Sequence, residues 1–231
     1  MLVRSIFILQ ALHHRAVIQF VNYILSPDDA TIYLLFEPCK RGSLDRIRRV
    51  IDKRPQVRTR VIKYILFELA EVLAYLKGRS VAHRDLKPSN ITFDSKGQLK
   101  LIDFDEAVCF DAKFSSLSQS KMLSDFGINV GEVMAMFSSQ KSRASSYVGT
   151  QIYMSPEMIH STVCDEKGDL WAYGCIFYEL FLGDYLHIEF DSVEKFEEQL
   201  AHRVEALAQK VDKSAIDLFK AIANYNPRER I

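Results

Sequence analysis

The residues from Leu170 to Tyr178 are apolar on nearly every side of the helix that they would form. A helix on the surface of a globular protein is apolar along one stripe only. This segment is therefore predicted to be a helix buried inside a domain, with other elements packed around it. The chain has 231 residues, of which 48% are hydrophobic, so it is long enough to build one core of this kind.

Amphipathic segments supply elements that can surround this helix. Residues from Thr59 to Lys77 place apolar side chains at helical spacing, and Gly78 is expected to end that helix in the left-handed conformation. A further helix is expected over residues 193–207, behind a capping pair formed by Asp191 and Glu194. The sequence thus predicts a domain in which helices dominate.

Two short hairpins are expected beside the helices. Residues 17–21 and 32–36 have the pattern of strands on either side of a turn rich in Pro and Asp. Residues 91–93 and 99–102 flank the turn sequence Ser95-Lys96-Gly97. Because helices form the majority and the sheets are small, the predicted fold class is α+β, mostly helical.

The overall charge is balanced, with 30 Lys and Arg residues against 30 Asp and Glu residues. A general binder of nucleic acid or of an acidic membrane needs a basic surplus, so neither partner is expected. No apolar run reaches the roughly 18 residues needed to span a bilayer. The four cysteines lie far apart and lack metal-ligand spacing, which indicates reduced thiols in a cytoplasmic or nuclear protein.

One basic cluster departs from this balance. Its members lie within a short stretch and are Arg46, Arg48, Arg49, Lys53, Arg54, Arg58 and Arg60. A solvated helix face is one interpretation, and a docking surface for an acidic partner is the other. The sequence leaves both open.

The segment 83–90 reads His-Arg-Asp-Leu-Lys-Pro-Ser-Asn, and an Asp-Phe pair ends the second hairpin. Phosphoryl transfer needs a carboxylate to accept the proton of a hydroxyl, ligands to hold magnesium on the phosphates, and a cation near the developing charge. Asp85 supplies the carboxylate and Lys87 supplies the cation. Asn90 and Asp103 supply the metal ligands.

This segment resembles the catalytic loop of eukaryotic protein kinases, and the Asp-Phe pair resembles the start of their magnesium-binding motif. Downstream, Gly149-Thr150 and residues 153–157 resemble the substrate-docking segment of that family. Residues 169–174 resemble the buried helix that anchors the catalytic loop. Residues 226–230 resemble the closing motif, whose Arg pairs with the Glu157 position. The resemblance covers essentially the whole chain.

The resemblance implies a protein-kinase-like fold. Residues 1–38 are then the remnant of the small N-lobe, and residues 39–231 form the C-lobe with a long activation segment, 103–157. Lys87 and Thr150 are what the serine/threonine branch carries. The implied activity is transfer of the γ-phosphate of ATP to protein Ser or Thr, with ATP and Mg²⁺ as cofactors and a protein substrate as partner.

The same matching places three residues around the adenine of ATP. Phe36 falls at the gatekeeper position behind the base, and Glu37 and Cys39 fall in the hinge whose backbone would bond it. An ordinary strand end explains Phe36 and Glu37 equally well. The four residues 154–157 resemble those of the never-in-mitosis-related and mitogen-activated-kinase-kinase groups.

The sequence departs from the family pattern in three places. A Gly-rich loop and a strand lysine should precede the first helix, yet the sequence begins at that helix. Ser5 stands where the family has the glutamate that pairs with this lysine, and Asp105 stands where glycine is usual. Slow turnover is therefore predicted for this chain alone. The alternative function is a catalytically impaired scaffold that binds partners through its helical lobe.

The expected activation segment carries two further candidates. Asp125, in a second Asp-Phe-Gly-like sequence, is rejected as the magnesium ligand because only Asp103 closes the hairpin begun after Asn90. Ser145 and Ser146 are candidate phosphorylation sites, with a phosphate on Ser146 expected to pair with an arginine of the catalytic loop. A small-molecule phosphotransferase is disfavoured because it would need no peptide-docking segment.

Overall fold

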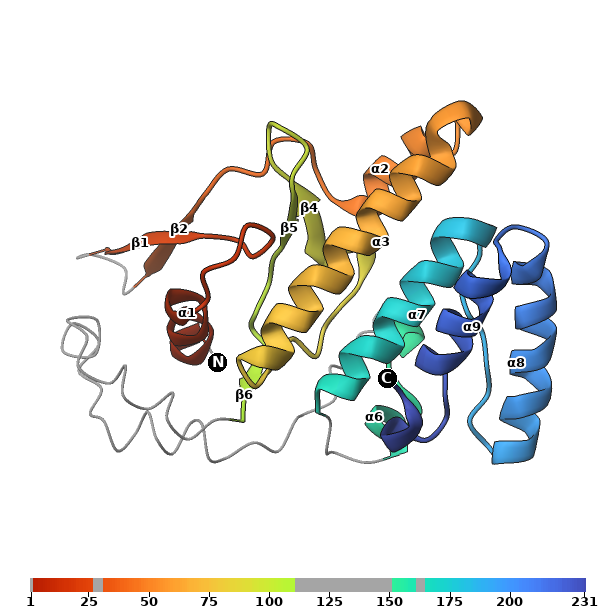
Figure 1. The fold of residues 1–231 in the computed structure, drawn as a ribbon. Helices are drawn as coiled ribbons and strands as arrows, with labels where there is room; N and C mark the ends of the chain where they lie inside the picture. Colours follow the sequence, from red (N-terminus) through yellow and green to blue (C-terminus); the bar gives the residue numbers. More distant parts are fainter. Residues whose placement is uncertain (1, 27–30, 111–150, 161–164) are drawn as a thin grey trace.

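A central helix, α7 (Glu166–Leu182), runs through the middle of the helical part of the protein (Figure 1). The computed structural model describes residues 2–26, 31–110, 151–160 and 165–231. Helix α7 contains the apolar segment predicted to be buried, and 13 of its 17 residues are buried. The Asp165 carboxylate caps its first turn by accepting the Lys167 amide, and Gly183 ends it in the left-handed conformation at φ 80°.

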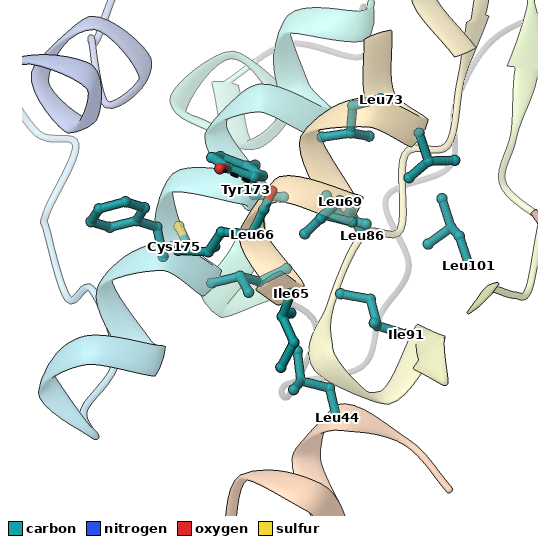
Figure 2. Close-up of a cluster of buried hydrophobic side chains, with 14 of the residues drawn as sticks. Leu44, Ile65, Leu66, Leu69, Leu73, Leu86, Ile91, Leu101, Tyr173 and Cys175 are labelled. Atoms are coloured by element: carbon teal, nitrogen blue, oxygen red, sulfur yellow. Dashed lines mark hydrogen bonds between the residues drawn. The ribbon is translucent and has the colours of Figure 1, made fainter. Parts of the chain in front are cut away.

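The long helix α3 (Pro55–Gly78) packs along α7 and forms one wall of the core. Figure 2 shows the α3 side chains Ile65 and Leu69 between Tyr173 of α7 and Ile91 of strand β4 (Ile91–Phe93). Leu69 is fully buried, so truncation to Ala should remove about 2–5 kcal/mol of stability. This core joins the helices to the strands that carry the polar loops described below.

The prediction that Gly78 ends α3 in the left-handed conformation is wrong. Gly78 is the last helical residue, and the positive φ of 55° belongs to Ser80. The Arg79 amide still bonds to carbonyls of the last helical turn. The left-handed residue at the end of the helix is therefore Ser80 and not Gly78. The Ser80 carbonyl then accepts the Phe110 amide at 2.8 Å, which fixes the backbone of Ser80 where strand β3 begins.

Two more helices pack on the far side of α7, α8 (Val193–Ala208) and α9 (Lys213–Ile222). The predicted helix over 193–207 is confirmed, but its cap is Ser192, whose hydroxyl accepts the Lys195 amide. Asp191 bonds to the Lys195 ammonium instead, at 3.0 Å. Short helices η3 (Gln151–Tyr153), α6 (Pro156–His160) and η4 (Pro227–Glu229) complete this side.

Three small antiparallel sheets lie beside the helices. Strand β1 (Phe20–Leu25) pairs with β2 (Ile32–Phe36), β4 (Ile91–Phe93) pairs with β5 (Leu99–Leu101), and β3 (Val81–Ala82) pairs with β6 (Val108–Cys109). The predicted hairpin after residue 90 is confirmed, with Gly97 in its turn at φ 88°. The fold is therefore α+β with helices in the majority, as predicted.

The first predicted strand is displaced along the chain. It was expected over residues 17–21, whereas β1 begins at Phe20. Val17 and Ile18 are buried and run parallel to β5, with the Ile18 amide donating to the Leu101 carbonyl at 3.0 Å. Burial against β5 has thus overridden the local hairpin pattern.

Two further helices lie in the part of the chain that the structure describes, α1 (Leu2–Ala11) under the first hairpin and α2 (Leu44–Ile51) ahead of α3 (Figure 1). Ile6, Phe7 and Ile8 of α1 are buried. Within the described part of the chain, no helix is both long enough and apolar enough to cross a membrane.

Candidate active site

The polar segment 83–90 is held by a carboxylate from the central helix. Asp169 of α7 accepts the His83 amide at 2.6 Å and the Arg84 amide at 2.8 Å. Burial raises the pKa of Asp169, and these amides act in the opposite direction by favouring its charged form. Arg84 has a positive φ of 66°, a backbone conformation that the two bonds help to hold. The predicted anchoring contact is confirmed.

Within its own loop, the Asp85 carboxylate accepts hydrogen bonds through only one of its two oxygens. Its Oδ2 accepts Lys87 Nζ at 2.7 Å and Asn90 Nδ2 at 2.9 Å. Asn90 Nδ2 also donates to the Asp85 carbonyl at 2.9 Å. Asp85 Oδ1 is buried and has no hydrogen-bond partner among the described residues. A buried acceptor without a donor is costly, so Oδ1 is available to a donor other than the described residues.

Asp103 lies at the end of β5 beside this loop, and its neighbour Phe104 fixes the segment in the core. The Phe104 ring meets the His83 ring edge to face, with centroids 4.8 Å apart, and His83 Nε2 lies 3.0 Å from the Ile102 carbonyl. His83 therefore packs the loop against the segment that follows β5. Asp103 has a positive φ of 63°, and its exposed carboxylate makes no bond to the other described residues.

The donor set of Asn90 and Asp103 fits Mg²⁺. Amide and carboxylate oxygens are the protein ligands that this ion prefers, and it commonly uses one or two of them together with substrate phosphates. Asn90 Oδ1 accepts no hydrogen bond among the described residues, because the amide nitrogen makes both contacts to Asp85. The described residues hold no group of three or more His, Cys, Asp and Glu side chains suited to a metal ion. A site completed by phosphate oxygens is consistent with both facts.

Asp105 makes contacts that sequence reasoning missed. Its Oδ1 accepts the Ser5 hydroxyl at 2.9 Å, and its carbonyl accepts Arg4 Nη2 at 3.0 Å, so α1 is bonded to the Asp-Phe-Asp segment. Burial raises the pKa of the neighbouring Glu106, while nearby Arg4 acts in the opposite direction. Both α1 residues lie about 100 positions from Asp105, so no local pattern signals the contact.

The hinge candidates lie after β2, and their side chains are not part of the Asp85 cluster. The Glu37 carboxylate bonds to Lys100 Nζ at 2.6 Å and to the Gln19 amide at 2.8 Å. The Glu37 amide donates to the Gln19 carbonyl, which extends the β1–β2 pairing by one residue. Cys39 is a half-buried free thiol. The Phe36 side chain is 40% exposed to solvent, and its ring makes an edge-to-face contact with the Phe20 ring.

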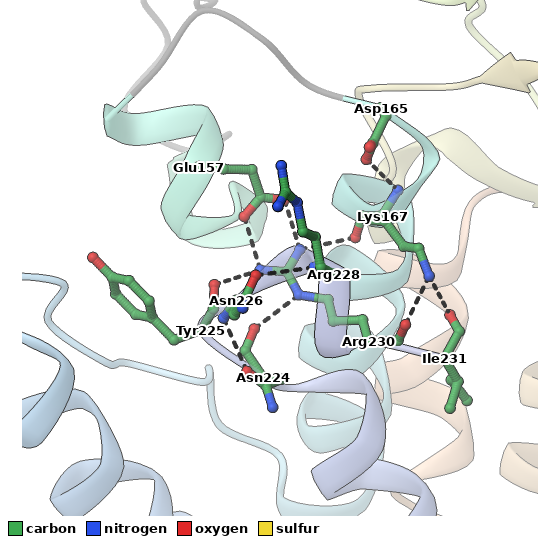
Figure 3. A network of polar contacts seen from close by, with 9 residues as sticks. All are labelled: Glu157, Asp165, Lys167, Asn224, Tyr225, Asn226, Arg228, Arg230 and Ile231. Carbon is green, nitrogen blue, oxygen red and sulfur yellow. Dashed lines mark hydrogen bonds and ion pairs between the residues drawn. The ribbon is translucent and has the colours of Figure 1, made fainter.

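The predicted pairing of Glu157 with an arginine of residues 226–230 is confirmed, and that arginine is Arg230 (Figure 3). Arg230 is fully buried at its side chain and donates both terminal nitrogens to the Glu157 carboxylate, at 2.6 and 2.8 Å. Its guanidinium lies 5.3 Å from the Trp171 ring centroid and also donates to the Lys167 carbonyl. This network fixes α6 against α7. It thereby holds in place the end of the segment that resembles a substrate-docking element, because Glu157 is the last residue of that segment.

A second buried carboxylate, Glu179 of α7, links two more elements. It forms an ion pair with Arg48 of α2 and accepts the Tyr153 hydroxyl of η3 at 2.7 Å. Burial and the bond to Glu179 both raise the pKa of Tyr153. No local sequence pattern indicates this contact, because its three members come from distant segments.

Several sequence candidates lie outside the described residues. These are Asp125, Ser145, Ser146, Gly149 and Thr150.

Comparison with known proteins agrees with the geometry. The protein kinase domain model matches residues 1–231. The chain is 28% identical over 184 residues to a probable serine/threonine-protein kinase nek2 of Dictyostelium discoideum, covering 78% of this chain and 37% of the relative. It is 28% identical over 228 residues to an Aurora kinase of Eremothecium gossypii, covering 99% and 53%. It is 31% identical over 199 residues to human 3-phosphoinositide-dependent protein kinase 1, covering 80% and 31%. The chain thus spans about a third to a half of these relatives.

Proposed function

Because the chain belongs to the protein kinase family, we propose that it transfers the γ-phosphate of ATP to serine or threonine side chains of proteins. The observation that carries this proposal is the arrangement around Asp85. One carboxylate oxygen is held by Lys87 and Asn90, while Oδ1 has no donor among the residues that the structure describes. That is what a group needs in order to orient a hydroxyl and accept its proton.

In this mechanism Asp85 Oδ1 accepts the hydroxyl proton of the substrate as the oxygen attacks the γ-phosphorus of ATP. The bond from that phosphorus to the bridging oxygen breaks, and ADP leaves. Lys87 Nζ, 2.7 Å from Asp85, places a positive charge where phosphoryl oxygens arrive. Asn90 and Asp103 would hold Mg²⁺, which would offset the negative charge of the phosphates. The Glu37 carbonyl and the Cys39 amide would bond the adenine, since neither group bonds to another described residue.

The test replaces Asp85 by Asn and measures phosphate transfer from labelled ATP to a mixed protein substrate in the presence of Mg²⁺. Loss of the general base should lower the rate by about 10²- to 10⁴-fold. Asp184→Asn, an exposed residue after α7, is the matched control and should keep the wild-type rate. Equal rates for Asp85→Asn and the wild type would contradict the assigned role of Asp85.

A second candidate function is a non-catalytic scaffold that binds partners through its helical part. The contact that favours it joins Ser5 to Asp105, because active family members are expected to have glutamate and glycine at these positions. Thermal unfolding with and without Mg²⁺ and ATP separates the two functions. Ligand at 100 times its dissociation constant should add about 2.7 kcal/mol of stability. Absence of both this shift and phosphate transfer would establish the scaffold.

A further inference from the structure

The chain is neutral overall, but its charge is unevenly distributed. Residues 40–60 contain nine Lys and Arg against two Asp, a net charge of +7. The other residues carry 21 cations against 28 carboxylates, a net charge of −7. This stretch covers the approach to α2, the whole of α2 and the first turn of α3.

Some of these cations have structural partners. Arg48 pairs with Glu179, and Arg58 pairs with Asp52 and donates to the Leu180 carbonyl. Six others are exposed and form no ion pair with any other described residue; together they make up what we term the cationic surface. They are Lys40, Arg46, Arg49, Lys53, Arg54 and Arg60. They therefore do not serve the fold through ion pairs within the described residues.

The cationic surface adjoins the candidate active site. Helix α2 contacts the short helix η1 (Pro88–Asn90), and it contacts β4. Ser43, directly before α2, bridges to Thr92, and the Arg41 amide donates to the Phe93 carbonyl at 3.1 Å. One side of α2 is thus attached to the loop that carries Asp85.

Helix α2 is also linked, through Glu179, to the segment that resembles a docking element. Arg48 of α2 pairs with Glu179, which in turn accepts the Tyr153 hydroxyl just ahead of α6. Helix α2 is therefore linked both to the loop with the catalytic carboxylate and to the segment that resembles a peptide-docking element.

We propose that the cationic surface binds an acidic stretch of the protein substrate, so that the enzyme selects acceptor sites flanked by Asp, Glu or phosphorylated residues. This inference rests on the proposed function and specifies its substrate class. Charge complementarity supports it, because exposed cations without internal partners attract an acidic chain. Each exposed ion pair is weak, but several acting on one segment produce selectivity. Val50, which is 54% exposed among these cations, adds apolar contact area.

The experiment measures binding directly, so it does not depend on catalysis. Two fluorescein-labelled peptides share one acceptor serine, and one carries Glu and Asp where the other carries Gln and Asn. Fluorescence anisotropy is recorded for the wild-type chain and for the variant Arg46→Glu, Arg49→Glu, Lys53→Glu. The control variant Lys210→Glu, Lys213→Glu, Lys220→Glu makes the same change of charge on exposed residues at and before α9.

The wild type should bind the acidic peptide about tenfold more tightly than the neutral one, and the preference should weaken as salt is raised. The cationic-surface variant should lose the preference, while the control variant should keep it. Circular dichroism establishes that both variants are folded. Phosphate transfer to the same peptides then shows whether the preference extends to catalysis.

Three results would overturn the proposal. Equal binding of the two peptides by the wild type would show that the surface is only solvated. Equal loss of preference in both variants would show that overall charge, and not this surface, is responsible. Binding to vesicles containing phosphatidylserine that is lost in the cationic-surface variant, without peptide preference, would assign the surface to a membrane. Failure of phosphate transfer with the peptide preference intact would count against the proposed activity alone.

Discussion

Ser5 of α1 donates its hydroxyl hydrogen to Asp105 Oδ1 across 2.9 Å, and Ser5 is only 3% exposed. The two residues stand where the family pattern has a glutamate and a glycine. The structure therefore joins α1 to the segment carrying Asp103 through a pair of residues that both depart from that pattern. Such a bond is strong for its size because one partner is a carboxylate.

A double-mutant cycle measures this link. Ser5→Ala and Asp105→Ala should each lower the free energy of unfolding by about 1–2 kcal/mol, because each removes the same charge-assisted bond. The double variant should lose less than the sum, with a coupling of about 1 kcal/mol in urea unfolding. Fully additive losses would show that the two side chains act independently.

The buried pair of Arg230 and Glu157 should be a major contributor to stability. Arg230→Met leaves the Glu157 carboxylate without its bidentate partner, and breaking a buried pair in this way costs about 3–5 kcal/mol. At this chain length the melting temperature should fall by about 6–20 °C in calorimetry. Lys220→Met, which removes an exposed cation from α9, should leave it nearly unchanged. A similar small effect of both variants would contradict the assignment.

Glu179 should contribute more to the free energy of unfolding than its partner Tyr153 does. Tyr153→Phe removes one hydrogen bond and should cost about 1 kcal/mol. Glu179→Ala leaves both Arg48 and the Tyr153 hydroxyl without their partner, so it should cost about 3 kcal/mol. Urea unfolding of both variants gives the comparison, and a larger loss for Tyr153→Phe would argue against Glu179 as the centre of the network.

The parts of the site that sequence predicted are those determined by short spacing. Asp85, Lys87 and Asn90 lie within six residues of one another, so a single turn brings them together. The hairpin that follows places Asp103 beside them. The family pattern supplied the pairing of Arg230 with Glu157, which no local spacing indicates.

The contacts that sequence missed depend on how distant elements pack. Ser5 and Asp105 are 100 residues apart, and Arg48 and Glu179 are 131 apart. The charges of Arg48 and Glu179 did not predict that these two residues pair, because the sequence contains many other residues of opposite charge. The displaced strand at Val17 has the same cause, since parallel pairing with Leu101 depends on the position of β5 in the folded chain.

The decrease in the free energy of unfolding at acidic pH should depend in part on His14. Its ring stacks on the Tyr75 ring with centroids 4.8 Å apart, and its Nδ1 accepts the Ala16 amide at 3.1 Å. Burial lowers the pKa of His14 from its usual 6.5, and the neighbouring Arg15 lowers it further. Lys100 acts in the same direction, whereas Glu68 and Glu71 act in the opposite one.

A histidine with a lowered pKa in the folded state makes the unfolded chain bind the proton first. Stability should therefore be fully present above pH 6.5 and fall as the pH drops through that value. Urea unfolding at pH 7.5, 6.5 and 5.5 in His14→Phe, which keeps the stacked ring, should show a flatter pH dependence than the wild type. His202→Phe, at an exposed position of α8, should retain the wild-type slope. If His14→Phe kept that slope as well, protonation of His14 would not be what weakens the fold in acid.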